Sequence, residues 1–260
     1  MSMEQIPYIF DIKRASAVDG PGIRTAVFLK GCNLDCFWCH NPEGKCAAPE
    51  SAWFAEKCIG CGTCRQYAPD QDDEAVAHCP AQARRRYGAL YAPNDLMRVL
   101  TADRDYYLAT GGGVTFSGGE CMLYPDFVAE MARRCRAEGI SVAVDTAGNV
   151  PYASFEKVLP YIDIILYDIK ALDPICHRRG TGCGNERILS NLEALCQTGK
   201  EIIIRIPQIP HFNEGEEVER ICAYCRERGL PYEVLPYHAF GEDKRRALAD
   251  SADVTPKNKP

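Results

Sequence analysis

Cys32, Cys36 and Cys39 form a tight run of cysteines with the spacing C-x3-C-x2-C, directly after the apolar segment 25–31. Three thiolates can hold a metal centre and leave one coordination position without a nearby protein ligand. A structural metal site closes all of its positions, whereas an open position is typical of a site that performs chemistry. A tetrahedral zinc site is the alternative, but His40 adjoins Cys39 and is badly placed to close the same tetrahedron. The spacing therefore favours an open iron–sulfur cluster.

The cysteine content as a whole also points to bound metal. The chain has 15 cysteines in 260 residues, and eight of them lie between Cys32 and Cys79. A disulfide framework is typical of short secreted chains, but this chain is long and begins without a charged segment followed by an apolar one. No apolar stretch approaches the roughly 20 residues of a membrane helix. We therefore expect a cytoplasmic protein whose thiols bind metal, with no membrane partner.

Charge and apolar content limit the function further. The formal net charge of −6 argues against a protein that coats nucleic acid. Hydrophobic residues make up 46% of the chain, enough to bury a sizeable core. The length fits one large α/β domain, or such a domain with a small insert.

The pattern of apolar residues predicts alternating strands and helices from about residue 94 onward. Strands are predicted at 113–116, 140–144, 162–167, 201–206 and 232–235, and helices at 125–138, 188–196 and 218–225. Strands and helices that alternate with short connections are typical of parallel βα units. With the strand that leads into Cys32, we expect about six parallel strands, enough for an open or partial barrel.

Residues 44–92 interrupt this alternation. They contain five cysteines, several prolines and glycines, and no convincing apolar period. We interpret them as a small inserted module that folds around metal. The barrel would then comprise residues 1–43 and 93–248, and the polar segment 249–260 is expected to be a tail.

Residues suited to chemistry follow each predicted strand. After the cysteine run come Ser117 to Glu120, Asp145, the segment 168–170, Arg205 and His238. The carboxyl ends of parallel strands share one face, and that face holds the active site in parallel βα folds. Glycines allow close approach of the backbone to a ligand, two aspartates suit a cation, and lysine and arginine suit a carboxylate or ribose hydroxyls. We therefore predict one polar mouth for a zwitterionic, nucleoside-bearing ligand.

With these motifs the chain resembles the radical S-adenosylmethionine superfamily. More specifically, it resembles the glycyl-radical-enzyme activating enzymes, the group of pyruvate formate-lyase activating enzyme. The matching segments, in the expected order, are 18–25, 31–43, 111–120, 145–148, 166–170, 204–207 and 235–238. The resemblance implies an α/β fold, a partial (β/α)6 TIM-like barrel of the radical S-adenosylmethionine type with an inserted ferredoxin-like iron–sulfur module.

The resemblance also implies roles for single residues. Cys32, Cys36 and Cys39 would hold a [4Fe-4S] cluster whose open iron chelates the amino and carboxylate groups of S-adenosylmethionine. Asp145 and Asp168 would form a monovalent-cation site. The residues expected around S-adenosylmethionine are Trp38, Cys39, His40, Gly118, Gly119, Glu120, Asp168, Ile169, Lys170, Arg205 and His238.

The implied activity is the formation of a radical on another protein. S-adenosylmethionine would be cleaved reductively, and the 5′-deoxyadenosyl radical would take a hydrogen atom from the Cα of a glycine in a partner glycyl radical enzyme. We expect a monomer that works anaerobically with a flavodoxin- or ferredoxin-type electron donor. The alternatives are a radical S-adenosylmethionine enzyme acting on a small molecule or peptide, and a ferredoxin-like electron carrier. The carrier would need neither the polar mouth nor the barrel.

The inserted module departs from the ferredoxin pattern in one respect. Cys58, Cys61 and Cys64 have the ferredoxin spacing C-x2-C-x2-C, but Ala68 stands where the next cysteine is expected. The next Cys-Pro pair begins at Cys79. We therefore predict one auxiliary [4Fe-4S] cluster on these three cysteines and Cys79, with Cys46 as the alternative fourth ligand. A zinc site on the same cysteines is the competing interpretation.

Another departure lies after the fifth predicted strand. His211 stands where relatives commonly have glycine, which is expected to alter a loop near the site.

Overall fold

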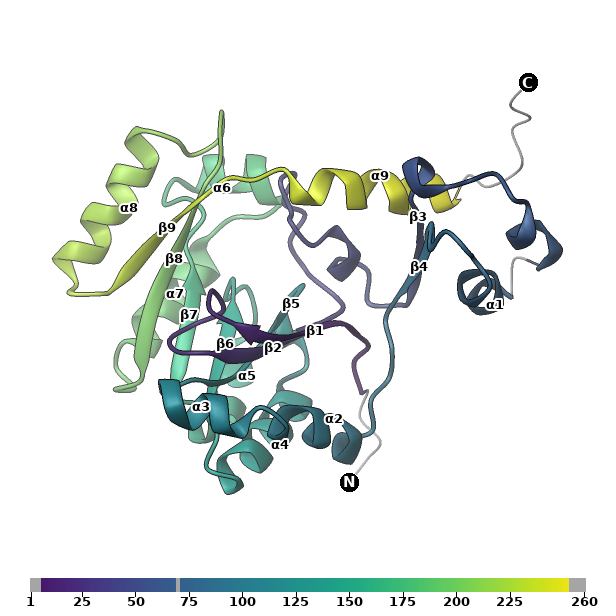
Figure 1. Ribbon diagram of the computed structural model, residues 1–260. Helices are drawn as coiled ribbons and strands as arrows, with labels where there is room; N and C mark the ends of the chain where they lie inside the picture. The colour runs from purple at the N-terminus through teal and green to yellow at the C-terminus, as the bar shows by residue number, and fades with distance from the viewer. Residues whose placement is uncertain (1–5, 69–70, 253–260) are drawn as a thin grey trace.

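A curved sheet forms the body of the protein (Figure 1). The computed structural model describes residues 6–68 and 71–252, and within these residues the sheet has seven strands in the order β1-β2-β5-β6-β7-β8-β9. All neighbouring pairs from β2 to β9 are parallel. These strands are β2 (Arg24–Leu29), β5 (Gly113–Gly118), β6 (Ser141–Thr146), β7 (Ile164–Asp168), β8 (Glu201–Gln208) and β9 (Tyr232–Pro236). The predicted partial barrel of parallel strands is confirmed.

The edge strand β1 (Ile9–Ser16) was not expected from the sequence. It pairs antiparallel with β2, with Ile9 opposite Leu29 and Ser16 opposite Arg24. Its pairing shifts register between Lys13 and Ser16, and Ala15 there has a positive φ of 56°. Charged residues and this irregularity interrupt the alternation by which a strand is recognised in sequence.

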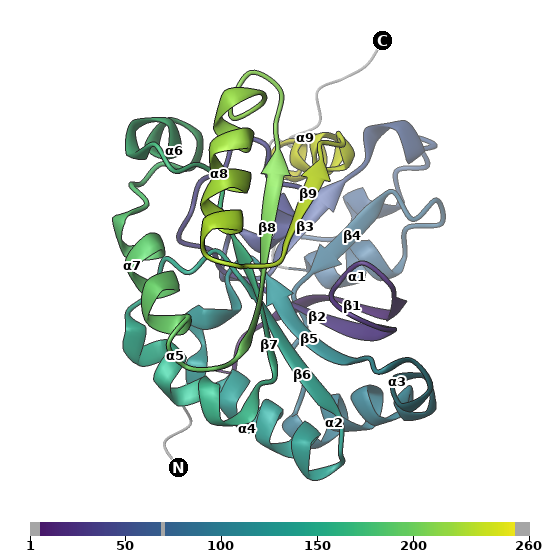
Figure 2. The same ribbon diagram turned by 90° about the vertical axis from the view of Figure 1, so that its left-hand side faces the viewer.

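Helices cover the outer face of the sheet (Figure 2). They are α2 (Pro93–Thr101), α3 (Arg104–Thr110), α4 (Pro125–Ala137), α5 (Tyr152–Val158), α6 (Pro174–Thr181), α7 (Glu186–Leu195) and α8 (Glu216–Glu227). Helix α4 shows why they form. It begins with Pro125, whose missing N–H is not needed at a helix start, and Gly139 follows its end with a left-handed φ of 72°. Between these limits Val128, Met131 and Cys135 are buried on one face.

The main core lies between this helical layer and the sheet. Strand residues such as Phe116, Val144 and Ile165 are fully buried there against Met131 and Leu192. Each such side chain contributes about 1.5–3 kcal/mol to stability by leaving water. The core therefore fixes the strand ends that carry the polar residues.

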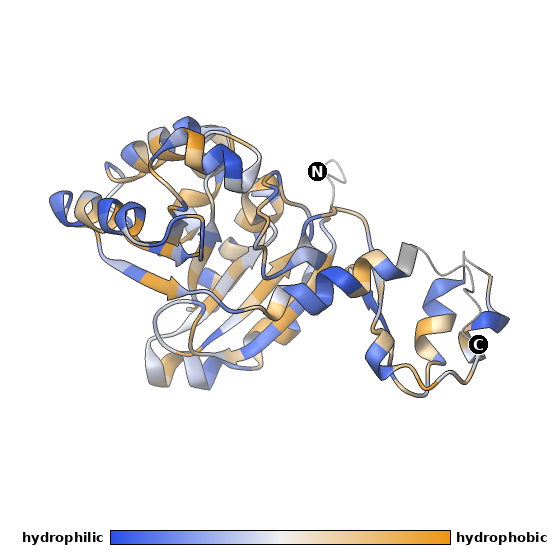
Figure 3. Cartoon of the chain, turned by 90° about the horizontal axis from the view of Figure 1, so that it is seen from above, coloured by the Kyte–Doolittle hydropathy of each residue, from blue (hydrophilic) through white to orange (hydrophobic). Residues whose placement is uncertain are grey.

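The inserted segment stays outside the barrel sheet and stands apart from the barrel in Figure 3. Its strands β3 (Glu50–Trp53) and β4 (Arg84–Tyr87) pair antiparallel as a separate sheet. Between them lie the short 3-10 helices η2 (Ala55–Lys57) and η3 (Thr63–Gln66) and helix α1 (Asp72–Ala77). Arg84 and Arg86 form ion pairs with Asp72, at 3.5 and 3.4 Å, and so attach α1 to β4.

Helix α9 (Phe240–Ala252) runs from the end of β9 to the inserted module (Figure 1). Its Ala247 is buried in a second core cluster with Phe10 and Phe28 of the barrel and Tyr87 of the module. The helix extends to Ala252 into the segment that the sequence predicted as a tail, and residues 253–260 lie outside the described part of the chain. Among the described helices, none is both long and apolar enough to cross a membrane.

Asn191 attaches helix α7 to the loop that follows β6. Its side-chain N–H2 group donates to the carbonyl oxygens of Gly148 and Val150, each at 2.8 Å, and the residue is only 5% exposed. Both carbonyls belong to irregular backbone, so the amide supplies hydrogen bonds that regular structure cannot.

Replacing Asn191 with alanine should therefore lower the free energy of unfolding by about 2 kcal/mol or more, because two buried acceptors lose their donor. Asn94→Ala is the matched control, since Asn94 is exposed and only accepts from Arg134. Its effect should stay within about 0.5 kcal/mol in urea unfolding. Equal effects of the two substitutions would contradict the role assigned to Asn191.

Candidate active site

The three-cysteine loop (residues 32–39) lies over the carboxyl end of the barrel and is held through its backbone. The N–H groups of Asp35 and Phe37 donate to the carbonyls of Thr181 and Gly180, at 2.7 and 3.2 Å. These carbonyls belong to the last turn of α6, where they have no partner within the helix. The N–H of Cys32 donates to Lys45 O at 3.0 Å. The loop is therefore fixed independently of its side chains.

The thiols of Cys32, Cys36 and Cys39 share one half-buried environment. Burial raises the pKa of Cys32 to about 11 and that of Cys36 to about 12, and it also raises the pKa of Cys39. The positive charge of Lys170 acts on all three thiols in the opposite direction. The N–H of Leu34 points at Cys32 Sγ at 3.4 Å. Buried thiols beside a cation and a peptide N–H form a donor set that fits a thiolate-bound cluster.

Lys170 supplies this cation. It is 8% exposed, and its Nζ donates to Asp168 Oδ2 at 2.6 Å. Burial alone would lower its pKa, but the charge of Asp168 and the hydrogen bond from Lys170 to Asp168 outweigh burial and raise the pKa above its ordinary value. The ammonium group is therefore charged at neutral pH.

Asn213 supports Lys170 and was missed in the sequence. Its side-chain N–H2 donates to the carbonyls of Lys170 and Pro207, each at 2.7 Å, and its Oδ1 accepts from the N–H of Ile209 at 2.8 Å. The only signal in the sequence was a polar residue shortly after a predicted strand, next to the apolar residue Phe212. The amide joins the end of β7 to the end of β8 below the mouth.

Gly118 and Gly119 bring the end of β5 against the backbone that flanks the three-cysteine loop. Gly118 has a φ of 129°, and a Cβ on Gly119 would lie 2.3 Å from the carbonyl oxygens of both Gly31 and Gly44. Any side chain at residue 119 would push the loop away from the strand.

Glu120 was expected to contact the cofactor, but in the structure its carboxylate is engaged by the protein. Oε1 accepts from Thr146 Oγ1 at 2.7 Å and from the N–H of Met122 at 3.0 Å, and Oε2 accepts from the N–H of Ala147 at 2.9 Å. Burial raises the pKa of Glu120, and these donors oppose the rise. The side chain thus links the loop after β5 to the loop after β6.

Asp145 and Arg205 face each other inside the barrel. Asp145 Oδ2 accepts from Arg205 Nη1 at 3.3 Å and from Ser117 Oγ at 2.8 Å. Arg205 Nη2 also donates to Val18 O at 3.3 Å, which brings the β1–β2 turn to β8. Burial raises the pKa of the Asp145 carboxyl, and the charge of Arg205 acts against that shift. Asp145 and Asp168, the two expected ligands of the monovalent cation, are therefore each paired with a positively charged side chain, Arg205 and Lys170 respectively.

Aromatic side chains line the other part of the mouth. Trp38 is buried against Phe212, with ring centroids 4.3 Å apart. His40 stacks on His238 at 4.0 Å. Burial and the neighbouring His238 lower the pKa of His40 to about 4, so its ring is neutral at pH 7. The side chain of Ile169 is buried in the main core, and its N–H donates to Arg205 O at 3.0 Å.

The cysteines of the inserted module are less enclosed. Cys58 and Cys61 are exposed, and Cys64 and Cys79 are half-buried. Among residues 6–68 and 71–252, no three histidine, cysteine, aspartate or glutamate side chains already form a metal-binding group. Cys46 lies elsewhere, in a cavity of about 430 Å³ that Cys32 and Cys183 also line. It therefore belongs to the surroundings of the cluster loop.

Glu120→Gln tests whether this carboxylate holds loops together. The new side-chain N–H2 group would face another donor, the N–H of Ala147 or of Met122, and one of these hydrogen bonds would be lost. The free energy of unfolding should therefore fall by about 2 kcal/mol. Exposed Glu156 serves as the control for the same substitution. If Glu120→Gln instead weakened only the affinity for S-adenosylmethionine, measured by isothermal titration, the residue would be a cofactor contact.

Comparison with known proteins places the chain in a family. The model of the radical SAM superfamily matches residues 26–225. The isethionate sulfite-lyase activating enzyme of Nitratidesulfovibrio vulgaris is 36% identical, over 94% of this chain and 88% of that protein. The indoleacetate decarboxylase activating enzyme of Tractidigestivibacter scatoligenes is 35% identical, over 94% of this chain and 87% of that protein.

A solved structure supports the fold. SuiB of Streptococcus suis, bound to the precursor peptide SuiA, superposes with a TM-score of 0.54 at 16% identity, over 85% of this chain and 43% of that chain. At this identity the likeness shows the fold alone. The match over residues 26–225, and relatives that share a third of their residues with nearly the whole chain, show that it belongs to the glycyl-radical-enzyme activating enzymes of the radical S-adenosylmethionine superfamily.

Proposed function

We propose that this activating enzyme binds its [4Fe-4S] cluster through Cys32, Cys36 and Cys39 and S-adenosylmethionine beside it in the barrel mouth. When bound, the cluster supplies the electron that cleaves S-adenosylmethionine, and the 5′-deoxyadenosyl radical then takes a hydrogen atom from the Cα of a glycine in the partner glycyl radical enzyme. The observation that carries the proposal is the shared burial of the three thiols beside charged Lys170.

The residues of the mouth then position the two groups. Lys170 offsets thiolate charge and is itself fixed by Asp168 and Asn213. Gly118 and Gly119 leave backbone groups accessible to the methionine end of S-adenosylmethionine. The backbone of residues 38–40 and the ring of His238 would border its adenine, and Arg205 would meet its polar groups or those of the incoming peptide. Because these side chains have fixed partners, little reorganisation is needed when the ligand binds.

We also propose a monovalent cation between Asp145 and Asp168. Support comes from the charge of Asp168, which acts to raise the pKa of the Asp145 carboxyl, as expected for two carboxylates in one neighbourhood. Arg205 or Lys170 would have to turn away when the cation binds, because each now occupies one carboxylate. Cation binding and ligand binding would thus be coupled.

For the inserted module we propose one auxiliary [4Fe-4S] cluster on Cys58, Cys61, Cys64 and Cys79. The four cysteines lie between β3 and β4 in sequence, and the exposed thiols are free to reach a common metal centre. The position of Cys46 next to Cys32 argues against Cys46 as the fourth ligand. The segment carries little apolar core of its own, which suits folding around metal.

The protein substrate is a glycyl radical enzyme. We propose that the chain works as a cytoplasmic monomer under anaerobic conditions, with a flavodoxin- or ferredoxin-type electron donor. The net charge of −6 supports the absence of a nucleic-acid partner.

Cys36→Ala tests the main proposal. After anaerobic reconstitution, dithionite and S-adenosylmethionine should yield 5′-deoxyadenosine with the unchanged chain. The yield should fall by more than about 100-fold in the variant. Removing a residue that only supports a metal ligand already costs about 10- to 100-fold in activity, and removing the ligand itself should cost more. The control is Cys196→Ala, an exposed cysteine on the far helix end. Retained cleavage by Cys36→Ala would contradict the assignment.

Cys79→Ala tests the auxiliary cluster separately. Iron analysis of the unchanged chain should give about eight irons, and the variant about four, as expected for two and one [4Fe-4S] centres. Dithionite-driven cleavage should persist in the variant, because the barrel site is untouched. About four irons and one zinc in the unchanged chain would establish the zinc interpretation instead.

A further inference from the structure

A buried histidine in the last two turns of α6 has no part in the proposed function. His177 is only 1% exposed, and its Nδ1 lies 2.8 Å from the carbonyl oxygen of Cys183. A carbonyl oxygen only accepts, so Nδ1 carries the proton and donates. Burial lowers the pKa of His177 below its ordinary value, so the ring is neutral at pH 7 and its Nε2 carries no proton.

The other ring nitrogen shows which side of the ring matters. In residues 6–68 and 71–252, the buried Nε2 of His177 has no hydrogen-bond partner. A buried acceptor without a donor lowers stability, and such a group calls for an explanation. The hydrogen bond from Nδ1 to Cys183 is the benefit that an apolar side chain would not give. The role of His177 therefore follows from what this bond fixes.

The bond fixes the connection between α6 and α7 against the last turn of α6. Thr181 closes the same turn, because its Oγ1 donates to the carbonyl oxygen of His177 at 2.9 Å. The carbonyl oxygens of Gly180 and Thr181 in this turn accept from backbone N–H groups of the three-cysteine loop, at 3.2 and 2.7 Å. His177 thus acts on the loop through one turn of helix.

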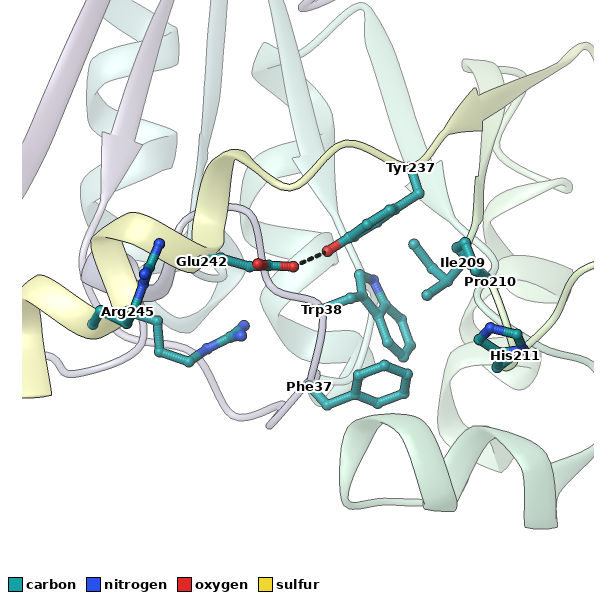
Figure 4. Close-up of a pocket in the computed structure, with 9 residues that line it drawn as sticks. Phe37, Trp38, Ile209, Pro210, His211, Tyr237, Glu242 and Arg245 are labelled. Atoms are coloured by element: carbon teal, nitrogen blue, oxygen red, sulfur yellow. Dashed lines mark hydrogen bonds between the residues drawn. The ribbon is translucent and has the colours of Figure 1, made fainter.

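The last turn of α6 also packs directly on the three-cysteine loop. A Cβ on Gly180 would lie 2.3 Å from the Phe212 ring and 2.7 Å from the Trp38 ring. Figure 4 shows the rings of Phe37 and Trp38, which the loop carries between its second and third cysteines and whose centroids are 4.8 Å apart. A displacement of this turn would therefore displace the loop.

The other end of the same connection is tied to the segment after β7. Asn185 is 2% exposed, and its side-chain N–H2 donates to the carbonyl oxygens of Ala171 and Leu172, each at 2.9 Å. These two residues directly follow Lys170, whose charge acts on all three thiols of the loop. Residues 182–185 therefore link the three-cysteine loop to the cation beside it.

We propose that His177 is a positioning residue, which holds the three-cysteine loop at a fixed distance from Lys170 through the last turn of α6. The inference rests on the proposed function, because it takes the three cysteines as ligands of the [4Fe-4S] cluster. A reduced cluster carries one more negative charge than an oxidised one, so a nearby ammonium group favours reduction. Loss of the hydrogen bond from His177 would loosen this spacing and make the cluster harder to reduce.

Two amide substitutions of His177 distinguish its two nitrogens. The N–H2 of asparagine can take the place of Nδ1, whereas that of glutamine reaches the place of Nε2. Hydrogen exchange, measured by mass spectrometry on the anaerobically reconstituted full chain, should become about 10-fold faster over residues 33–38 in His177→Gln. In His177→Asn it should stay within about 3-fold of the unchanged chain. Equal exchange over residues 33–38 in the two variants would overturn the proposal.

The reduction potential separates a positioning role from a merely structural one. In an anaerobic redox titration followed by EPR, the cluster whose spectrum changes on adding S-adenosylmethionine should have a more negative potential in His177→Gln than in the unchanged chain. His177→Asn should restore the potential. An unchanged potential in His177→Gln, despite faster exchange over residues 33–38, would show that His177 only stabilises the helix end and would overturn the link to Lys170.

Thr181→Val tests the same turn from its other side, with Thr101→Val as the matched control. Thr101 Oγ1 donates to Met97 O at 2.9 Å, the same hydrogen bond to the fourth preceding residue, at the end of α2. Helix α2 lies at the opposite end of the barrel from α6 in Figure 1. Both variants should lose similar stability in urea, but only Thr181→Val should speed exchange over residues 33–38. Equally fast exchange there in Thr101→Val would mean that general destabilisation explains the effect, against the proposal.

Hydrogen exchange also separates this inference from the proposed function. If the unchanged chain formed no 5′-deoxyadenosine with dithionite and S-adenosylmethionine, the proposed function would fail. The comparison of His177→Gln with His177→Asn would still decide whether His177 fixes the loop, because exchange reports on backbone hydrogen bonds and not on catalysis.

Discussion

The contact between the end of β5 and the backbone on either side of the three-cysteine loop is the constraint on which the site depends. Gly119 leaves no room for a side chain, because the carbonyl oxygens of Gly31 and Gly44 fill the space of a Cβ. The segment after β5 therefore donates two hydrogen bonds directly to the segment before the cysteines, from Gly119 N–H to Leu29 O and from Glu120 N–H to Gly31 O, at 2.9 and 2.8 Å. Backbone atoms cannot change rotamer, so this contact places the cysteines rigidly relative to the strand ends.

Charge pairing within the mouth follows from that enclosure. A buried carboxylate or ammonium is costly unless it has a partner, and the chain supplies one for each: Arg205 for Asp145, and Lys170 for Asp168. The pairs hold their side chains in fixed positions, while the thiols stay beside the positive charge of Lys170. The mouth is thus organised for an anionic cluster and a zwitterionic ligand.

Helix α9 gives the inserted module a fixed relation to the cluster loop. Lys244 Nζ contacts Glu43 Oε1 at 2.5 Å just after the cysteines, and Ala247 packs where barrel and module meet. Lys30 adds a second tie, since its buried Nζ donates to Glu43 O and to Glu50 Oε2 on β3 at 2.6 and 2.8 Å. A metal centre in the module would therefore be coupled mechanically to the barrel site.

The sequence by itself determined the succession of parallel strands along the chain, the helices α4, α7 and α8 between them, and the polar residues that follow the strands. These features depend on the spacing of residues that are close together in the sequence, so they can be recognised from the sequence alone. Helices α2, α3, α5 and α6 were not predicted from it. Only the tertiary structure decided which polar groups meet: the carboxylate of Glu120 turns to Thr146 and Ala147, and Asn213 joins β7 to β8. It also decided that β1 closes the edge of the sheet and that α9 reaches the module. The physical reason is that such pairings depend on strand register and on the path of the connecting loops, which bring together residues far apart in the sequence.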